Sequence, residues 1–169
     1  MLITDGAVTR SKTLQFQKTR KRGIKMKTDT IALLKECDAG AKMAISSIDQ
    51  VINKIQSTSL FQLLKESKSH HEKLCDEIHH TLNSYQEAEK DPNPIAKVFA
   101  NIKTSLMTTL EQDDATIAKL MTDGCNMGVK SLSEYLNKYT NADAKSKDYC
   151  NRLIAIEDQL AKDLRPHLL

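Results

Sequence analysis

Apolar residues recur every three or four positions along most of the chain, the spacing that places them on one face of an α-helix. The first long stretch, residues 28–57, carries Ile31, Leu34, Cys37, Ala41, Ala44, Ile48, Val51 and Ile55. Thr28 is a suitable N-cap for this helix, and Ser59 begins a Ser-x-x-Gln capping box for a second one that runs to Tyr85. Because so few residues separate the two stretches, we expect an antiparallel hairpin, unless they fuse into one unusually long helix.

Residues 87–94, Glu-Ala-Glu-Lys-Asp-Pro-Asn-Pro, form the clearest break in the pattern, with Asn93 as a cap and Pro94 at the first helical position. A shorter amphipathic helix is predicted over residues 95–110, about 24 Å long at 1.5 Å per residue. A helix of that length would travel along much of a bundle. This connection is therefore expected to be a crossover rather than a tight turn.

Two more amphipathic stretches complete the pattern. One begins at Asp113 or Asp114, and the other begins at Ala142 or Asp143 and ends at Leu164. Tryptophan is absent and Phe and Tyr together number seven, so the apolar residues are mostly aliphatic and suit helices. The sequence predicts an all-α domain, an antiparallel four-helix bundle of ferritin-like type with a short crossover helix between the second and third long helices.

The positive charge is concentrated at the N-terminus. Residues 1–25 hold seven basic residues against Asp5 alone, a net charge of +6, which leaves −3 for residues 26–169. We interpret residues 1–25 as a disordered or non-native tail, because Met26 offers a second start position and the tail lacks a sustained apolar face. Residues 26–169 are then the bundle. Nucleic acid is an unlikely partner, reachable only through the basic cluster at residues 18–22.

No run of 18 apolar residues occurs, so neither a membrane span nor a membrane partner is expected. The four cysteines lie one in each predicted long helix, at spacings unlike those of a secreted disulfide scaffold. We expect reduced, mostly buried thiols and a cytoplasmic protein.

The middle of the predicted bundle is where bundles of this type hold metal ions. Di-iron bundles need two Glu-x-x-His pairs, but the sequence offers one, Glu77 with His80, near the edge of an apolar face. Counting along the helices places three other donors near mid-bundle, with two acidic residues nearby. The resulting candidate ligands for zinc or iron are His71, Cys125, Glu157, Asp38 and Glu72.

A simpler interpretation needs no metal. His71 would then be a hydrogen-bonded core or boundary histidine, and Cys125 would fill space beside Gly124 and Gly128. Glu157 would face solvent. The Gly124 to Gly128 spacing also predicts close approach of a neighbouring helix.

Several segments resemble a bacterial family of uncharacterised ferritin-like four-helix-bundle proteins, distantly similar to rubrerythrin and ferritin. The resemblance rests on residues 33–44, 63–74, 113–117 and 123–135. It implies the fold, and it implies metal binding only where ligands persist. Here Cys125-Asn126 replaces the acidic pair of the family pattern, and Lys68-x-x-His71 stands where rubrerythrin-like relatives have Glu-x-x-His.

The sequence therefore favours a non-catalytic helical-bundle protein of stress or accessory type. It would act through self-association, as a homo-oligomer, or through binding of a protein partner. The alternative is a metal-binding ferritin-like protein with a degenerate ligand set, which oxidises or stores iron or binds zinc.

Overall fold

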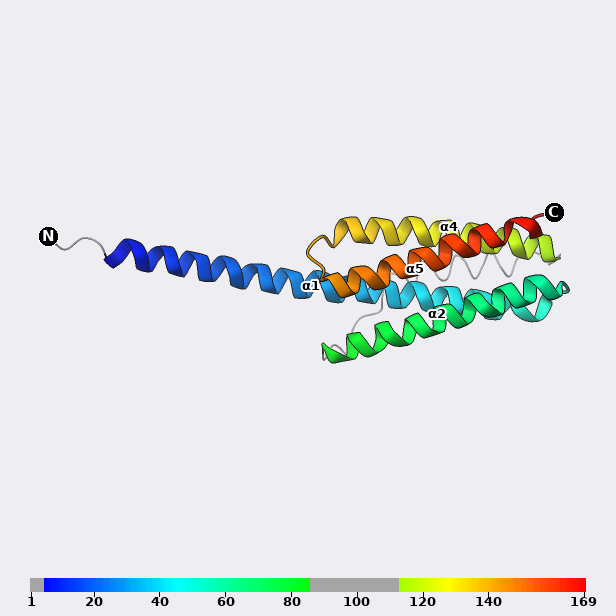
Figure 1. The fold of residues 1–169 in the computed structure, drawn as a ribbon, viewed down its shortest axis with the longest axis horizontal. Coiled ribbons are helices and arrows are strands. Elements are labelled where there is room, and N and C mark those ends of the chain that lie inside the picture. Colours follow the sequence, from blue (N-terminus) through cyan, green and yellow to red (C-terminus); the bar gives the residue numbers. More distant parts are fainter. Residues whose placement is uncertain (1–4, 86–112) are drawn as a thin grey trace.

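The computed structural model describes residues 5–85 and 113–169, with side chains from residue 17 onward in the first range. This part of the chain is almost entirely helical apart from the turns between helices and contains no β-strand, which confirms the all-α prediction. The predicted break at 87–94 and the predicted helix at 95–110 lie outside the described residues. The four long helices are α1 (Asp5–Val51), α2 (Thr58–Ser84), α4 (Asp114–Lys138) and α5 (Ala144–Asp163), with single 3-10 turns at Ile52–Lys54 and Arg165–His167 (Figure 1).

Helix α1 begins much earlier than Thr28, the cap expected from the sequence. It starts at Asp5, so most of the segment expected to be a disordered tail belongs to a helix of 47 residues. The Thr28 hydroxyl donates to the Ile24 carbonyl oxygen at 3.0 Å, as a threonine inside a helix does. The basic segment is rich in Lys, Arg and Gln, which favour helix, and it contains no proline. The first part of α1 projects beyond the other helices (Figure 1).

The turn between α1 and α2 is held in place by a residue that is distant in the sequence. The cap of α2 is Ser57 rather than Ser59, and its Oγ accepts a hydrogen bond from Leu60 N at 3.3 Å. The carboxylate of Asp114, at the start of α4, accepts from Gln56 N at 2.9 Å and from Ser57 N at 2.7 Å. A residue 57 and 58 positions away from them thus satisfies two backbone donors that this turn leaves free.

Helices α4 and α5 begin where the sequence predicts. Asp113 caps α4, accepting from Thr116 N at 2.7 Å, and these hydrogen bonds hold the pKa of Asp113 below its ordinary value. Asp143 caps α5 in the same way, accepting from Ser146 N at 2.7 Å. Both caps follow from an aspartate placed immediately before an amphipathic stretch.

Contacts between named residues give the direction of each helix. Helices α2 and α5 are antiparallel, because rising numbers in one meet falling numbers in the other: His71 with Glu157, Glu77 with Arg152, and Thr81 with Tyr149. The same test makes α1 antiparallel to α2, because Asp38 meets Cys75 and Asp49 meets Lys68. It also makes α4 antiparallel to α5, because Leu132 meets Cys150 and Gly128 meets Glu157. Helices α1 and α5 are parallel: Thr30 meets Asp143, and Gly40 meets Leu153.

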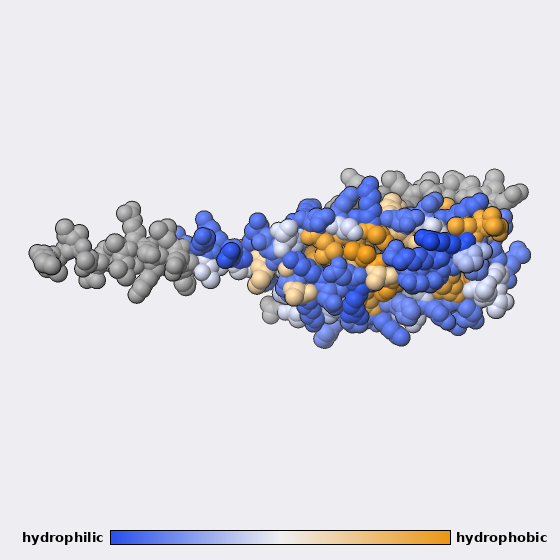
Figure 2. Space-filling model, turned by 45° about the horizontal axis from the view of Figure 1, so that its top comes forward, coloured by the Kyte–Doolittle hydropathy of each residue, from blue (hydrophilic) through white to orange (hydrophobic). Residues whose placement is uncertain are grey.

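The core consists of two aliphatic clusters, one at each half of the bundle. Ile78 and Leu153 belong to the cluster nearer the projecting arm, and Leu64 and Ile117 belong to the other. All four cysteines are free and buried, one on each described long helix, as the sequence predicts. Hydrophilic residues cover much of the visible surface around apolar patches (Figure 2). In the described part of the chain, no helix combines the length and the apolar character that a membrane crossing requires.

Candidate functional site

A buried polar layer surrounds His71 in the interior of α2. The imidazole is fully buried, and its Nδ1 lies 2.8 Å from the carbonyl oxygen of Ser67, one turn earlier. A carbonyl oxygen can only accept, so Nδ1 carries a proton and donates it to this bond. The Ser67 hydroxyl is a second, longer neighbour at 3.4 Å. The tautomer is thereby fixed, and Nε2 is the ring atom that remains for other chemistry.

Glu157 of α5 meets that second nitrogen. Its Oε1 lies 3.3 Å from His71 Nε2, and its side chain is almost as buried as the imidazole. One proton occupies the contact, either on Nε2, giving an ion pair, or on the carboxyl group, giving a neutral pair. In both forms each partner satisfies the other, which buried polar groups require.

Cys125 of α4 is the third polar side chain of the layer. Burial raises the pKa of its thiol, and the carboxylate of Glu157, to which it is hydrogen-bonded, raises it further. Glu157 lies against the backbone of α4 at Gly128, where an added Cβ would come within 3.3 Å of Glu157 Cδ. The atoms nearest to Gly128 thus belong to the Glu157 side chain and not to the backbone of α5, so the close backbone approach predicted from the glycine spacing is not shown there. At Gly124 an added Cβ would meet nothing within 4 Å.

The structure brings together three of the five predicted ligands and separates the other two. Asp38 pairs with Lys42 at 2.8 Å and accepts a 3.6 Å hydrogen bond from the thiol of Cys75. Glu72 is exposed and lies 3.5 Å from Lys68 on the surface of α2. Within residues 17–85 and 113–169, no group of three or more His, Cys, Asp or Glu side chains is arranged to hold a metal ion.

The simpler interpretation of these residues is half correct. His71 is a hydrogen-bonded core histidine, as that interpretation holds, but Glu157 is buried rather than facing solvent. The reason is the missing side chain at Gly128, which leaves room for a carboxylate between α4 and α5. A glycine opposite an acidic residue could have signalled this, but only with the helix register known.

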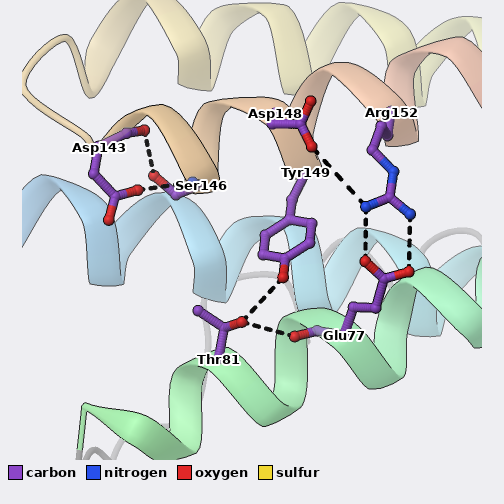
Figure 3. A network of polar contacts seen from close by, with 7 residues as sticks. All are labelled: Glu77, Thr81, Asp143, Ser146, Asp148, Tyr149 and Arg152. Carbon is purple, nitrogen blue, oxygen red and sulfur yellow. Dashed lines mark hydrogen bonds and ion pairs between the residues drawn. The ribbon is translucent and has the colours of Figure 1, made fainter.

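A second polar network joins α2 to α5 nearer the projecting arm (Figure 3). Glu77 forms a two-pronged ion pair with Arg152, with N to O distances of 2.7 and 2.9 Å, and this contact lowers the pKa of Glu77. Thr81 and Tyr149 share a buried hydrogen bond of 3.1 Å between their hydroxyl oxygens. Glu77 is thus paired with an arginine, while His80 is exposed. The two residues of this Glu-x-x-His therefore do not meet at one metal-binding site.

Two of the remaining thiols, those of Cys37 and Cys75, are held in protonated form. The thiol of Cys37 is hydrogen-bonded to that of Cys150 across α1 and α5, and this bond together with burial raises the pKa of Cys37. Burial and the neighbouring Asp38 raise the pKa of Cys75 to about 11. Because the thiolate is the reactive form of cysteine, Cys37 and Cys75 are poor nucleophiles at neutral pH. The hydrogen bond between Cys37 and Cys150 acts in the other direction on Cys150 and lowers its pKa.

Sequence reasoning missed one half-buried carboxylate, Glu36 of α1. Among the described residues, its Oε2 is the buried side-chain oxygen or nitrogen that has no hydrogen-bond partner. Burial raises the pKa of Glu36, although hydrogen bonds from Tyr135 and Tyr139 of α4 oppose that shift. Nothing in the local sequence signals this burial, since it depends on where α4 packs.

Comparison with known proteins adds no identity to this geometry. No protein-family model matches the chain, and no curated protein or solved structure matches it. The resemblance to ferritin-like proteins accordingly stays a prediction from the sequence.

Proposed function

We propose that this chain is a non-catalytic, ferritin-like helical bundle that acts by association, either with further copies of itself or with another macromolecule. The observation that carries the proposal is the projection of α1 beyond the bundle (Figure 1). All residues from 17 to 28 are exposed, whereas burial of α1 begins at Thr30. We call residues 17–28 the basic arm.

The groups capable of chemistry support a structural rather than a catalytic role. The three members of the polar layer are at most 7% exposed, so a substrate has no direct access to His71, Cys125 or Glu157. Their polar atoms are also occupied by one another, through the His71 to Glu157 and Cys125 to Glu157 contacts. A catalytic constellation would instead present a nucleophile or base to a cleft.

The directions of the helices support the ferritin-like part of the proposal. Helices α1 and α5 run one way and α2 and α4 the other, and Asp114 at the start of α4 contacts Ser57 at the start of α2. The end of α2 is therefore separated from the start of α4 by the length of α2, about 40 Å for its 27 residues. A bundle with one long crossover connection has this topology.

The basic arm itself supports association. Isolated helices of this length are marginal in water, because most helical stability in proteins comes from packing of an apolar face. Two large apolar side chains of the arm lie in the open, Ile24 at 60% and Met26 at 50% exposure. The two side chains lie on opposite sides of the helix, and a partner that enclosed the arm would stabilise the helix and remove this apolar surface from water.

Size-exclusion chromatography with light scattering, combined with affinity capture, tests this proposal. We expect either a species heavier than 19.0 kDa or a reproducibly captured partner. The variant Ile24→Glu/Met26→Glu should abolish that association, whereas Met127→Glu, which alters an apolar residue of α4 that is 42% exposed, should preserve it. A strict monomer at high concentration that captures nothing would contradict the proposal.

Two observations favour the metal-binding alternative, and the first is the convergence of His71, Glu157 and Cys125. Donation from Nδ1 to a backbone carbonyl is also the usual support of a metal-binding histidine, because it fixes the orientation of the ring. Elemental analysis of protein purified without an affinity tag, after growth with iron and zinc, tests it. Stoichiometric metal that is lost in His71→Ala would favour this alternative, and a metal content near zero would reject it.

A further inference from the structure

We propose that the basic arm binds the phosphate backbone of B-form duplex DNA, with the helix lying in the major groove. This inference rests on the proposed function of partner binding and names the class of partner. It also revises the low expectation for nucleic acid that followed from the sequence. That expectation rested on the absence of aromatic stacking groups and of a recognition element in a short basic tail, whereas the structure continues α1 through the segment as a helix.

The charge of the arm is dense and of one sign. Its twelve residues carry six cations, all exposed, and the sequence has no acidic residue between Asp5 and Asp29. Four of the cations fall at spacings of three and four residues, which places them on one face of the helix. These are Lys18, Lys21, Arg22 and Lys25, with Arg20 and Lys27 on the opposite side.

The first acidic residue after the arm is committed to the bundle. The carboxylate of Asp29 accepts hydrogen bonds from the backbone N of Asn141 at 3.0 Å and from its Nδ2 at 2.8 Å. These bonds lower the pKa of Asp29, with a smaller contribution from Lys25. The carboxylate thus fixes the base of the arm to the loop between α4 and α5.

The shape of the arm suits a groove. One continuous helix joins the arm to the core, so the bundle sets the direction of the arm (Figure 1). An α-helix with its side chains is about 10–12 Å across, close to the roughly 12 Å width of the major groove of B-DNA. Basic helices that extend from a coiled coil or a helical bundle enter DNA in this way.

Other anionic partners fit the arm less well. A membrane-surface helix needs an apolar face, but Ile24 and Met26 are about 200° apart around the helix, and the described arm is mostly hydrophilic (Figure 2). Single-stranded nucleic acid is usually held by stacking on aromatic rings, and residues 17–28 contain none. A second copy of the chain offers only −3 over residues 26–169, far less than a phosphate backbone with one charge per about 1.7 Å.

Fluorescence anisotropy of a labelled 20-base-pair duplex, titrated with the full chain at several salt concentrations, tests the inference. If four cations engage phosphates, log K falls with log salt at a slope of about −3.6, so affinity drops roughly 150-fold between 50 and 200 mM salt. The variant Lys21→Gln/Arg22→Gln should reduce the slope by about 2 and weaken binding. The matched control Lys65→Gln/Lys73→Gln, with two exposed lysines of α2, should leave both unchanged.

A further variant separates the helix from its charge. Ile24→Pro keeps every cation but breaks the helix at the middle of the arm, and we expect at least a tenfold loss of duplex affinity. Full affinity in Ile24→Pro would overturn the docking of a helix in the groove. Unchanged salt dependence in Lys21→Gln/Arg22→Gln would overturn the role of the arm.

Competitors decide the class of partner. Stronger binding to a single strand, to duplex RNA or to vesicles of anionic phospholipid than to duplex DNA would overturn the choice of B-form DNA. If DNA binding is absent while light scattering shows association or capture yields a specific partner, this inference fails and the proposed function stands. If neither occurs, both fail.

Discussion

Removal of the Glu157 carboxylate should show how much the buried polar layer contributes to stability. Glu157→Ala leaves His71 Nε2 buried without its neighbour at 3.3 Å, at a cost of about 1–3 kcal/mol for an unsatisfied polar group. The lost side-chain atoms leave a void between α4 and α5, which adds roughly 1 kcal/mol. We expect Glu157→Ala to lower the free energy of unfolding by about 2–4 kcal/mol.

The assay is urea unfolding followed by circular dichroism, with the cycle of His71→Ala, Glu157→Ala and the double variant. A direct interaction predicts a coupling energy of about 1 kcal/mol or more, because each single variant already leaves the other residue without its partner. Glu77→Ala is the control, since it breaks a half-exposed ion pair at the same helix interface. It should cost about 1 kcal/mol at most.

Two results would refute this reasoning. If Glu157→Ala cost no more than Glu77→Ala, the layer would not be a closed, mutually satisfied group. If the two single variants were simply additive, the 3.3 Å contact between Nε2 and Oε1 would carry no energy of its own.

Three further predictions concern packing, thiol reactivity and capping. Gly124→Ala should raise the thermal midpoint, because the added Cβ would lie in open space and alanine favours helix over glycine by about 1 kcal/mol. Gly128→Ala should lower the thermal midpoint, because the added Cβ would lie 3.3 Å from Cδ of Glu157. With a pKa raised to about 11 and a buried position, Cys75 should react with iodoacetamide at pH 8 far more slowly in the native protein than in urea, as mass spectrometry can measure. Asp113→Ala should lower the urea midpoint at pH 7; because the folded pKa of Asp113 is depressed, the deficit should persist above the ordinary aspartate pKa and disappear as pH falls through the folded value.

Local signals in the sequence were sufficient for part of the fold. Asp113 and Asp143 precede amphipathic stretches and cap α4 and α5 as predicted. The start of α1 was misplaced because the apolar pattern begins only where packing begins, while helix propensity continues through the basic residues before it. The cap of α2 was misplaced by two residues because Asp114, distant in sequence, holds the preceding turn.

The candidate site shows the same limit. Counting along helices placed His71, Cys125 and Glu157 at one level because helical rise is constant, and the structure brings these three together. Counting cannot give rotation about each axis, so it also included Asp38 and Glu72, which point to other neighbours. Rotation is set by packing between helices. The contact of Gly128 with Glu157 and the burial of Glu36 Oε2 both depend on that rotation.

The central claim is that the bundle is a closed scaffold and that the basic arm is its binding surface. Hydrogen exchange with mass spectrometry tests this most directly, on the free protein and with saturating duplex DNA. We predict slow exchange in the buried segments around Leu33 and Leu153 in both states, and fast exchange of residues 17–28 that slows when duplex is added. Exchange of the arm that is as slow as the core in free monomer, or that no added partner changes, would contradict the account.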